Sequence, residues 1–318
     1  MAHRSVPFHP AGAGTLAAVL ASAVLSSCAY FAPAYFAPAS FAPHRPLPEG
    51  ATERSFATPS ELDPAWTPLA PGLDFCAALV RDPPLRLRAL RADLSGGRIV
   101  PVVGPLPSAA GMDAGKSEET ISSILTTSFA RDYGCLAAVN ANPFDKSTDT
   151  EGIPLKTVGI AVSDGRVLSP PNPRYAALLF SAAGRARVVE QADIRDGDAI
   201  RNAIGGFFVV LKGGSPVGND RIRNPRTAAA VGADGKTLYL LVVDGRTAAS
   251  VGTTARETGL LLRLLGGQDG LILDGGGSSA MAIRGEDGAA FLANVPVHGG
   301  MPGRQRAVGI CLGVREGK

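Results

Sequence analysis

Two apolar runs in the C-terminal half give the clearest pattern in this chain. LYLLVVDGR (238–246) and LILDGGGSSAM (271–281) both lead into Asp-Gly, and residues 253–265 between them carry apolar side chains at helical spacing before Gly266 and Gly267. A strand, a crossover helix and a second strand form a βαβ unit, whose strands, when adjacent, lie about 4.8 Å apart. The pattern therefore predicts that Asp244 and Asp274 lie side by side at the sheet edge where open α/β sheets bind ligands.

Strand-like segments also dominate the rest of the chain, and one further helix is predicted over residues 117–130. The segments at 85–94 and 98–103 are expected to pair across residues 95–97. Many strands and two clear helices indicate an α+β domain with a mixed β-sheet and few helices. The other expected strands span residues 135–140, 156–163, 175–181, 186–190, 204–212, 226–232, 237–243, 270–274, 279–283 and 306–314.

The N-terminal part predicts export. Residues 11–25 are apolar but too short to cross a bilayer comfortably, and Leu25-Ser26-Ser27-Cys28 follows, which resembles a bacterial lipobox. On that resemblance residues 1–27 are a signal peptide and Cys28 carries lipid; an ordinary secretory signal is the alternative. A near-repeat of Pro and aromatic residues over 30–50 predicts an extended tether. We expect a lipid-anchored tether over 28–71, a folded domain over 72–318 and a place in the bacterial cell envelope.

Composition narrows the chemistry. The formal net charge is +3 and no dense Lys/Arg run is interleaved with aromatic residues, so a nucleic-acid partner has little support. The four histidines do not cluster and no C-x-x-C occurs, which argues against a zinc site. Lipidation of Cys28 would leave Cys76, Cys135 and Cys311, so at least one thiol has no intramolecular partner; Cys311 is expected in the core.

The glycines after Asp274 suggest an anion site. Without side chains, they leave backbone N–H groups open to an oxyanion such as a phosphate. Asp-Gly is also a common turn at a strand end, and Asp244 fits either interpretation. Asp274 is followed by more glycine and serine than a turn needs, and no G-x-S-x-G elbow supports a serine nucleophile. The predicted oxyanion donors are Gly275, Gly276, Gly277, Ser278 and Ser279.

Three segments together resemble the phosphodiester glycosidase family: NPRTAAAVGADGKTLYLLVVDGR, GLILDGGGSSAMAI and PGRQRAVGICLGV. The resemblance covers roughly residues 140–314. It implies cleavage of a sugar-1-phosphodiester at the glycosidic carbon. Asp274 and Asp244 are the candidate catalytic carboxylates, one of which would act as base or nucleophile at the sugar carbon. Guanidinium groups bind phosphate in a bidentate manner, which suits this substrate. The candidate phosphate- or sugar-binding residues are Arg226, Arg246, Arg306, Asn140 and His298.

Some of these assignments have structural alternatives. Arg226 could close an internal ion pair, Asn140 could hold a loop, and His298 could be an ordinary surface histidine rather than a proton-transfer group.

Three functions remain open at this point. The first is hydrolysis of sugar-1-phosphodiester linkages in envelope or extracellular glycans. The second is metal-dependent phosphoester hydrolysis, with Asp244 and Asp274 holding Mg²⁺ or Ca²⁺; no cofactor is otherwise indicated. The third is a non-catalytic lipoprotein for glycan binding or exopolysaccharide assembly. The expected partners are a phosphosugar or glycan substrate, and a membrane through the lipid anchor only.

Overall fold

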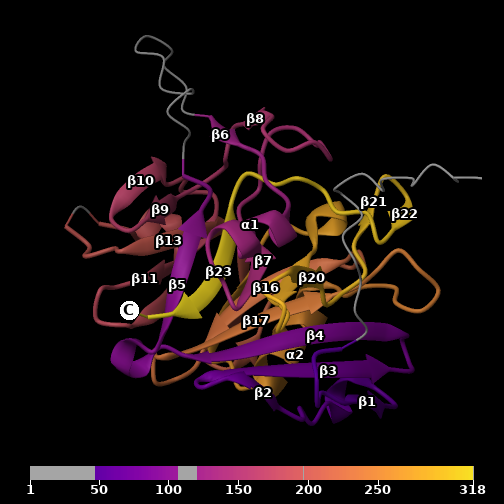
Figure 1. Ribbon diagram of the computed structural model, residues 1–318. Coiled ribbons are helices and arrows are strands. Elements are labelled where there is room, and N and C mark those ends of the chain that lie inside the picture. Colours follow the sequence, from indigo (N-terminus) through magenta and orange to yellow (C-terminus); the bar gives the residue numbers. More distant parts are fainter. Residues whose placement is uncertain (1–46, 107–119, 196, 318) are drawn as a thin grey trace, which may run out of the picture. The chain divides into compact units, whose positions relative to one another are not determined.

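The computed structural model describes residues 47–106, 120–195 and 197–317 (Figure 1). The expected signal peptide, Cys28 and the first part of the tether lie outside these residues. Within them the chain is mostly β-sheet with two α-helices, consistent with the predicted α+β or sheet-rich fold.

The largest sheet in the described part of the chain has nine strands. Its order is β1-β3-β4-β17-β16-β18-β14-β15, and β2 pairs with β3. Apart from the parallel pair β1 and β3, neighbouring strands run antiparallel. The strands are β1 (Glu53–Phe56), β2 (Thr67–Ala70), β3 (Leu73–Val80), β4 (Leu85–Asp93), β14 (Phe208–Lys212), β15 (Ser215–Pro216), β16 (Arg226–Val231), β17 (Thr237–Val243) and β18 (Asp269–Ile272).

Strand β16 separates the two strands that precede the aspartates. Ala228 of β16 lies opposite Leu241 of β17 on one side and Ile272 of β18 on the other, with antiparallel pairing to both. β17 and β18 are therefore parallel but lie about 9.6 Å apart, twice the usual strand spacing. The prediction of adjacent strands was wrong because β16, the hairpin partner of β17, occupies the neighbouring position and the crossover spans it.

Two five-stranded sheets accompany the large sheet in the described residues, with orders β10-β9-β13-β11-β12 and β20-β19-β7-β23-β5. The predicted pairing of 85–94 with 98–103 was wrong, because β4 pairs within the nine-stranded sheet and β5 pairs with β23. The strands are β5 (Ile99–Gly104), β7 (Ala137–Asn140), β9 (Ala161–Ser163), β10 (Arg166–Ser169), β11 (Ala176–Phe180), β12 (Ala186–Glu190), β13 (Asn202–Gly206), β19 (Met281–Arg284), β20 (Ala290–Leu292) and β23 (Cys311–Glu316).

Strand β17 shows how the layers pack. Leu240 and Val242 point into a core shared with β7 and β23, whereas Leu241 and Val243 point to the opposite face, toward the helix α2 (Ala255–Leu265). A strand buried on both faces reads as a continuous apolar run, which explains the sequence LYLLVV. The nine-stranded sheet is thus covered by α2 on one face and by five-stranded sheets on the other.

Of the two predicted helices, one agrees with the structure and the other differs from it. α2 begins at a capping box in which Thr254 and Glu257 exchange hydrogen bonds, and it ends at Gly266 in the left-handed conformation, as predicted. The helix predicted over 117–130 is instead the short strand β6 (Ile121–Ser122) followed by α1 (Thr126–Asp132), which packs on β7 and β23 (Figure 1). Ile121, Leu125 and Phe129 have helical spacing, but pairing with β8 (Pro154–Leu155) draws the first into a strand.

The folded region begins before Gly72, the predicted start. β1 and β2 belong to the nine-stranded sheet, and Glu53 of β1 forms an ion pair with the buried Arg88 of β4 over 2.7 Å. The Pro-rich composition of this stretch concealed two strands.

The remaining observations concern the cysteines, the length of the helices and the shortest elements. Cys76, Cys135 and Cys311 are buried free thiols, so Cys311 is a core residue as predicted. None of the helices in the described residues is long and apolar enough to cross a membrane. The last strands are β21 (Val297–His298) and β22 (Met301–Pro302), and the short 3-10 helices are η1 (Pro59–Glu61), η2 (Ser95–Gly97), η4 (Gln191–Asp193) and η5 (Gly276–Ser278).

Candidate active site

The segment from Asp274 to Ala280, here called the Asp274 turn, carries the chain from one sheet to another. It leaves β18 of the nine-stranded sheet, passes through η5 and enters β19 of a five-stranded sheet. The backbone N–H of Asp274 donates to the carbonyl of Ala141 over 2.8 Å. Its position is therefore fixed where the two sheets meet.

Asn140, at the end of β7, holds both ends of this turn. Its Nδ2 donates to the carbonyl of Asp274 over 2.6 Å, and its Oδ1 accepts from the N–H of Ala280 over 3.2 Å. The same Oδ1 accepts from the hydroxyl of Thr227 over 2.6 Å. The side chain is fully buried, and these contacts match the alternative that it holds a loop rather than touching substrate.

Two glycines of the turn leave room for guanidinium groups. Gly276 has φ of +62°, and a Cβ there would lie 2.8 Å from Nη2 of Arg246. A Cβ at Gly277 would lie 2.7 Å from Nη2 of Arg306 and 3.2 Å from Nδ1 of His298. Glycine at these positions thus allows the two arginines to approach the backbone of the turn.

The predicted opening of the turn's N–H groups to an oxyanion was largely wrong. Gly275 N–H donates to the Asp274 carboxylate, and Gly276 N–H donates to the carbonyl of Pro225. The N–H groups of Ser278 and Ser279 donate within the turn itself. These four N–H groups therefore stabilise the turn rather than face an anion.

Asp274, Ser278, Arg306 and His298 form one connected group, and Arg246 lies beside it. Ser278 hydrogen-bonds the Asp274 carboxyl, and Nη1 of Arg306 donates to Ser278 Oγ over 3.2 Å. Nε of Arg306 donates to Nδ1 of His298 over 3.3 Å. We call these five residues the Asp274 cluster.

Burial and charge shift the pKa values within the cluster. Burial raises the pKa of Asp274 from 3.8 to about 6, against the opposing effects of Ser278 and the positive charge of Arg306. Burial also lowers the pKa of His298, and the charges of Arg306 and Arg246 lower it further. At neutral pH the imidazole is therefore uncharged and its Nδ1 is available as the acceptor for Arg306.

The cluster has more positive than negative charge. Arg246 and Arg306 form no ion pair with a carboxylate among the described residues within 4 Å, and Asp274 is the acidic group that faces Arg306. Nη1 of Arg246 donates weakly to the carbonyl of Val297, over 3.4 Å. Two neighbouring guanidinium groups, of which one faces a carboxylate, make a site that favours a bound anion.

Asp244 lies outside this cluster, contrary to the prediction that it stands beside Asp274. Its Oδ1 accepts from Nδ2 of Asn294 over 2.9 Å and from the N–H of Val295 over 3.0 Å. Its Oδ2 is buried without a hydrogen-bond partner. Burial raises the pKa of this carboxyl from 3.8 to about 6. The sequence could not show this, because the interposed β16 is a property of the tertiary arrangement.

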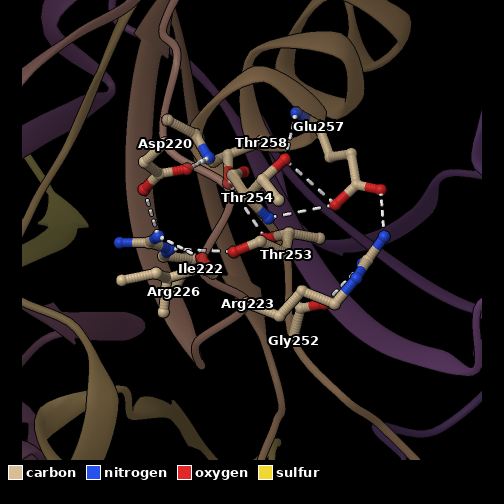
Figure 2. Close-up of polar contacts among 10 residues, drawn as sticks. Asp220, Ile222, Arg223, Arg226, Gly252, Thr253, Thr254, Glu257 and Thr258 are labelled. Carbon is tan, nitrogen blue, oxygen red and sulfur yellow. Dashed lines mark hydrogen bonds and ion pairs between the residues drawn. The ribbon is translucent and has the colours of Figure 1, made fainter.

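Arg226 lies beside the Asp274 turn, with its Cδ 3.9 Å from where a Cβ at Gly275 would be, but its polar contacts are with other residues. Its Nη2 forms an ion pair with Asp220 over 2.7 Å and donates to the carbonyl of Ile222 over 3.1 Å, while Nε donates to the carbonyl of Thr253 over 3.0 Å (Figure 2). This is the internal ion pair that the sequence left open as the alternative to phosphate binding.

The described residues contain no cluster of side chains suited to binding a metal ion. Within residues 47–317, leaving aside 107–119 and 196, no group of three or more His, Cys, Asp or Glu side chains is placed to hold a metal ion. The sequence hypothesis of Mg²⁺ or Ca²⁺ rested on Asp244 and Asp274 sharing one ion, and β16 lies between the strands that carry them.

Asn294 is the supporting residue that sequence analysis missed. Besides holding Asp244, its Nδ2 donates to the carbonyl of Ser279 and its Oδ1 accepts from the N–H of Met281. Its one signal in the sequence is a lone amide within the apolar run FLANVPV. Asn294 therefore connects the predicted aspartate Asp244 to the far end of the Asp274 turn.

Comparison with known proteins identifies the family of the chain. The sequence model of the phosphodiester glycosidase family matches residues 133–315, more than half of the chain. The chain belongs to the phosphodiester glycosidase family. The match contains Asn140, Arg226, the Asp274 turn and the terminal segment with His298 and Arg306. Membership supports a role as a glycan phosphodiester hydrolase.

Solved structures share the fold. A hypothetical protein from Synechocystis has a TM-score of 0.57 at 15% identity, covering 80% of this chain and 64% of that one. The catalytic domain of zebrafish N-acetylglucosamine-1-phosphodiester alpha-N-acetylglucosaminidase has a TM-score of 0.56 at 20% identity, with 78% and 84% covered. A protein of Burkholderia pseudomallei K96243, named as exported, has a TM-score of 0.50 at 17% identity, with 73% and 74% covered. No curated protein matches the chain by sequence.

Proposed function

We propose that this protein hydrolyses a sugar-1-phosphodiester at the glycosidic carbon, releasing the free sugar and a phosphomonoester. The observation that carries the proposal is the Asp274 cluster, in which the Asp274 carboxyl faces Arg306, Arg246 lies beside Arg306, and neither arginine forms an ion pair with another carboxylate in the described residues. A phosphodiester carries one negative charge and would complement the excess positive charge.

Each member of the cluster has a role in this proposal. Arg306 and Arg246 bind the phosphate, and Ser278 and His298 orient Arg306 through the hydrogen bonds that they accept. Asp274 acts at the sugar carbon. With its pKa raised to about 6, the carboxyl is mostly ionised at neutral pH yet basic enough to remove a proton from water.

The leaving group suits a site with a single carboxylate. When the bond between the sugar carbon and its oxygen breaks, the negative charge develops on a phosphate already held by guanidinium groups, so strong general-acid help is unnecessary. The oxygen of water joins the sugar carbon, its proton leaves through Asp274, and the phosphate keeps the bridging oxygen. This scheme does not require Asp244, whose contacts are supporting ones.

The site of action is part of the proposal. We propose that the protein is exported, carries lipid at Cys28 and acts on envelope or extracellular glycans. The lipobox-like sequence before Cys28 supports this.

The test uses UDP-N-acetylglucosamine and a panel of other sugar-1-phosphodiesters in ¹⁸O-labelled water, with the label located by mass spectrometry. Label in the free sugar is expected; label in the phosphate would instead favour the metal-dependent hydrolase, and a chelator would then abolish turnover. Asp274→Asn should lower the rate at least about a hundredfold. The matched control is Asp82→Asn at an exposed aspartate, which should leave it unchanged. Equal rates for the wild type and Asp274→Asn would refute the assignment.

A further inference from the structure

The loop between β15 and β16, residues 217–225, lies against the Asp274 turn. The carbonyl of Pro225 accepts a hydrogen bond from the N–H of Gly276 over 2.9 Å. A Cβ at Gly275 would lie 2.9 Å from the same carbonyl oxygen, so the two backbones are in close contact. Where Pro225 lies therefore determines where the first half of the turn can lie.

Arg226 follows Pro225 directly and fixes its position through three contacts (Figure 2). Its guanidinium bonds the Asp220 carboxylate, the Ile222 carbonyl and the Thr253 carbonyl, and it is largely shielded from water. The loop is thereby folded back on the first residue of β16.

Asp220 connects the loop to the helix α2. One carboxylate oxygen, Oδ2, accepts from Arg226, and the other, Oδ1, accepts from the N–H of Ala255 at the first position of the helix over 2.6 Å. This N–H is one of the groups at a helix start that lack a partner within the helix. Asp220 thus joins the arginine beside the turn to a rigid element.

We propose that Arg226 and Asp220 are a positioning pair for the Asp274 turn, acting through the carbonyl of Pro225. Its effect on catalysis rests on the function proposed above. A displacement of about 1 Å near the reacting atoms is enough to lower a rate about a hundredfold. The pair therefore supports catalysis without touching substrate.

Direct binding of phosphate by Arg226 predicts different results. If Arg226 held phosphate, its loss would weaken inhibition by inorganic phosphate and raise KM. In a positioning role, phosphate affinity stays with Arg246 and Arg306, which come from other segments, while kcat falls.

The variants to compare are Asp220→Asn, Arg226→Ala and Arg226→Lys. Asp220→Asn keeps the shape and an acceptor for Ala255 but removes the charge that Arg226 binds. We expect its kcat to fall about tenfold with KM and the phosphate inhibition constant within about twofold. Arg226→Lys should recover part of the kcat lost in Arg226→Ala, since it keeps the charge.

The matched control is Arg223→Ala. Arg223 lies in the same loop, and its guanidinium bonds Glu257 of the same helix and the carbonyl of Gly252 rather than Asp220 (Figure 2). It should leave kcat within about twofold. Equal losses of kcat in Asp220→Asn and Arg223→Ala, in proportion to lost stability, would refute the proposal and indicate a merely structural loop. A raised phosphate inhibition constant would identify Arg226 as a phosphate ligand instead.

Amide hydrogen exchange at Gly276 tests the pair without turnover. Exchange should be faster in Asp220→Asn than in the wild type, at an unchanged urea midpoint. The reason is that the hydrogen bond from Gly276 N–H to the carbonyl of Pro225 would open more often. Unchanged exchange would overturn the positioning role whatever the substrate. If the wild type cleaves no sugar-1-phosphodiester but exchange responds, the proposed function fails and the positioning pair stands.

Discussion

The side-chain amide of Asn140 donates a hydrogen bond to the main-chain carbonyl of Asp274 over 2.6 Å. Asn140 ends β7 of a five-stranded sheet, whereas Asp274 follows β18 of the nine-stranded sheet. The backbone position of the candidate catalytic carboxyl is therefore set by a residue of the opposite sheet.

Asn140→Ala should destabilise the protein by about 2–4 kcal/mol, because Thr227, Ala280 and Asp274 would each lose a buried hydrogen-bond partner. Urea unfolding measures the change. The exposed Asn219→Ala is the control, expected within about 0.5 kcal/mol of the wild type. A similar free energy of unfolding for both variants would show that the amide is dispensable.

Asp244→Asn should change how stability depends on pH. The pKa of the buried Asp244 carboxyl is raised from 3.8 to about 6, so between these values the folded state binds more protons than the unfolded state. Stability therefore falls as pH rises from about 4 to about 6, by about 3 kcal/mol at most for this group.

The variant removes that contribution, so its stability should fall less than that of the wild type over the same window. Free energies of unfolding at pH 4 and pH 7 give the comparison. Asp274→Asn is a useful second variant for the same comparison of pH dependence, because the pKa of Asp274 is also raised to about 6. Parallel pH profiles for the wild type and Asp244→Asn would contradict the prediction.

Gly277→Ala should lower activity with little loss of stability. The new Cβ would meet the guanidinium of Arg306 at 2.7 Å, and the end of a long side chain can move aside. We expect KM for the phosphodiester to rise about tenfold, as a charge-assisted contact is lost. In an Arg306→Ala background the same substitution should have no further effect, and a double-mutant cycle measures this coupling. Additive losses would mean that the Cβ acts through another group.

A chain that begins at Gly72 should be less stable than one that begins at Leu47. The shorter chain lacks β1 and β2, and the buried Arg88 loses the carboxylate of Glu53. An unpaired buried charge costs about 3–5 kcal/mol. Thermal and urea unfolding of the two chains check the prediction, and Glu53→Ala in the longer chain isolates the ion pair. Equal stability would place the true domain start at Gly72.

The local sequence pattern predicted single strands and helices better than it predicted which strands pair with each other. The apolar runs gave β16, β17 and β18, and the flanking Gly266 marked the end of α2. Strand order was not predictable, since hairpin pairing places β16 beside β17 and moves β18 one position away. The alternation of Arg and apolar residues in β4 likewise gave a strand but not its partner.

The site was predictable to the same extent. The unusual run of glycines identified Asp274, and the family resemblance added Arg246, Arg306 and His298, which the structure brings together. The same motifs also contain Asp244 and Arg226, but in the structure each has a partner of its own, Asn294 and Asp220. Asn294 lies 50 residues from Asp244, and Asp220 lies six residues from Arg226 across an irregular loop, so no helical or strand spacing encodes either contact.

The Asp274 turn is the passage from one sheet to another, and this has a consequence for inactivation. An active site on a flexible loop can be lost while the body of an enzyme stays folded. Here the sheets cannot separate without pulling apart the bonds from Asn140 and Ala141 to the turn. On heating, catalytic activity should persist until the whole domain unfolds. When the domain refolds, activity should return together with the folded structure.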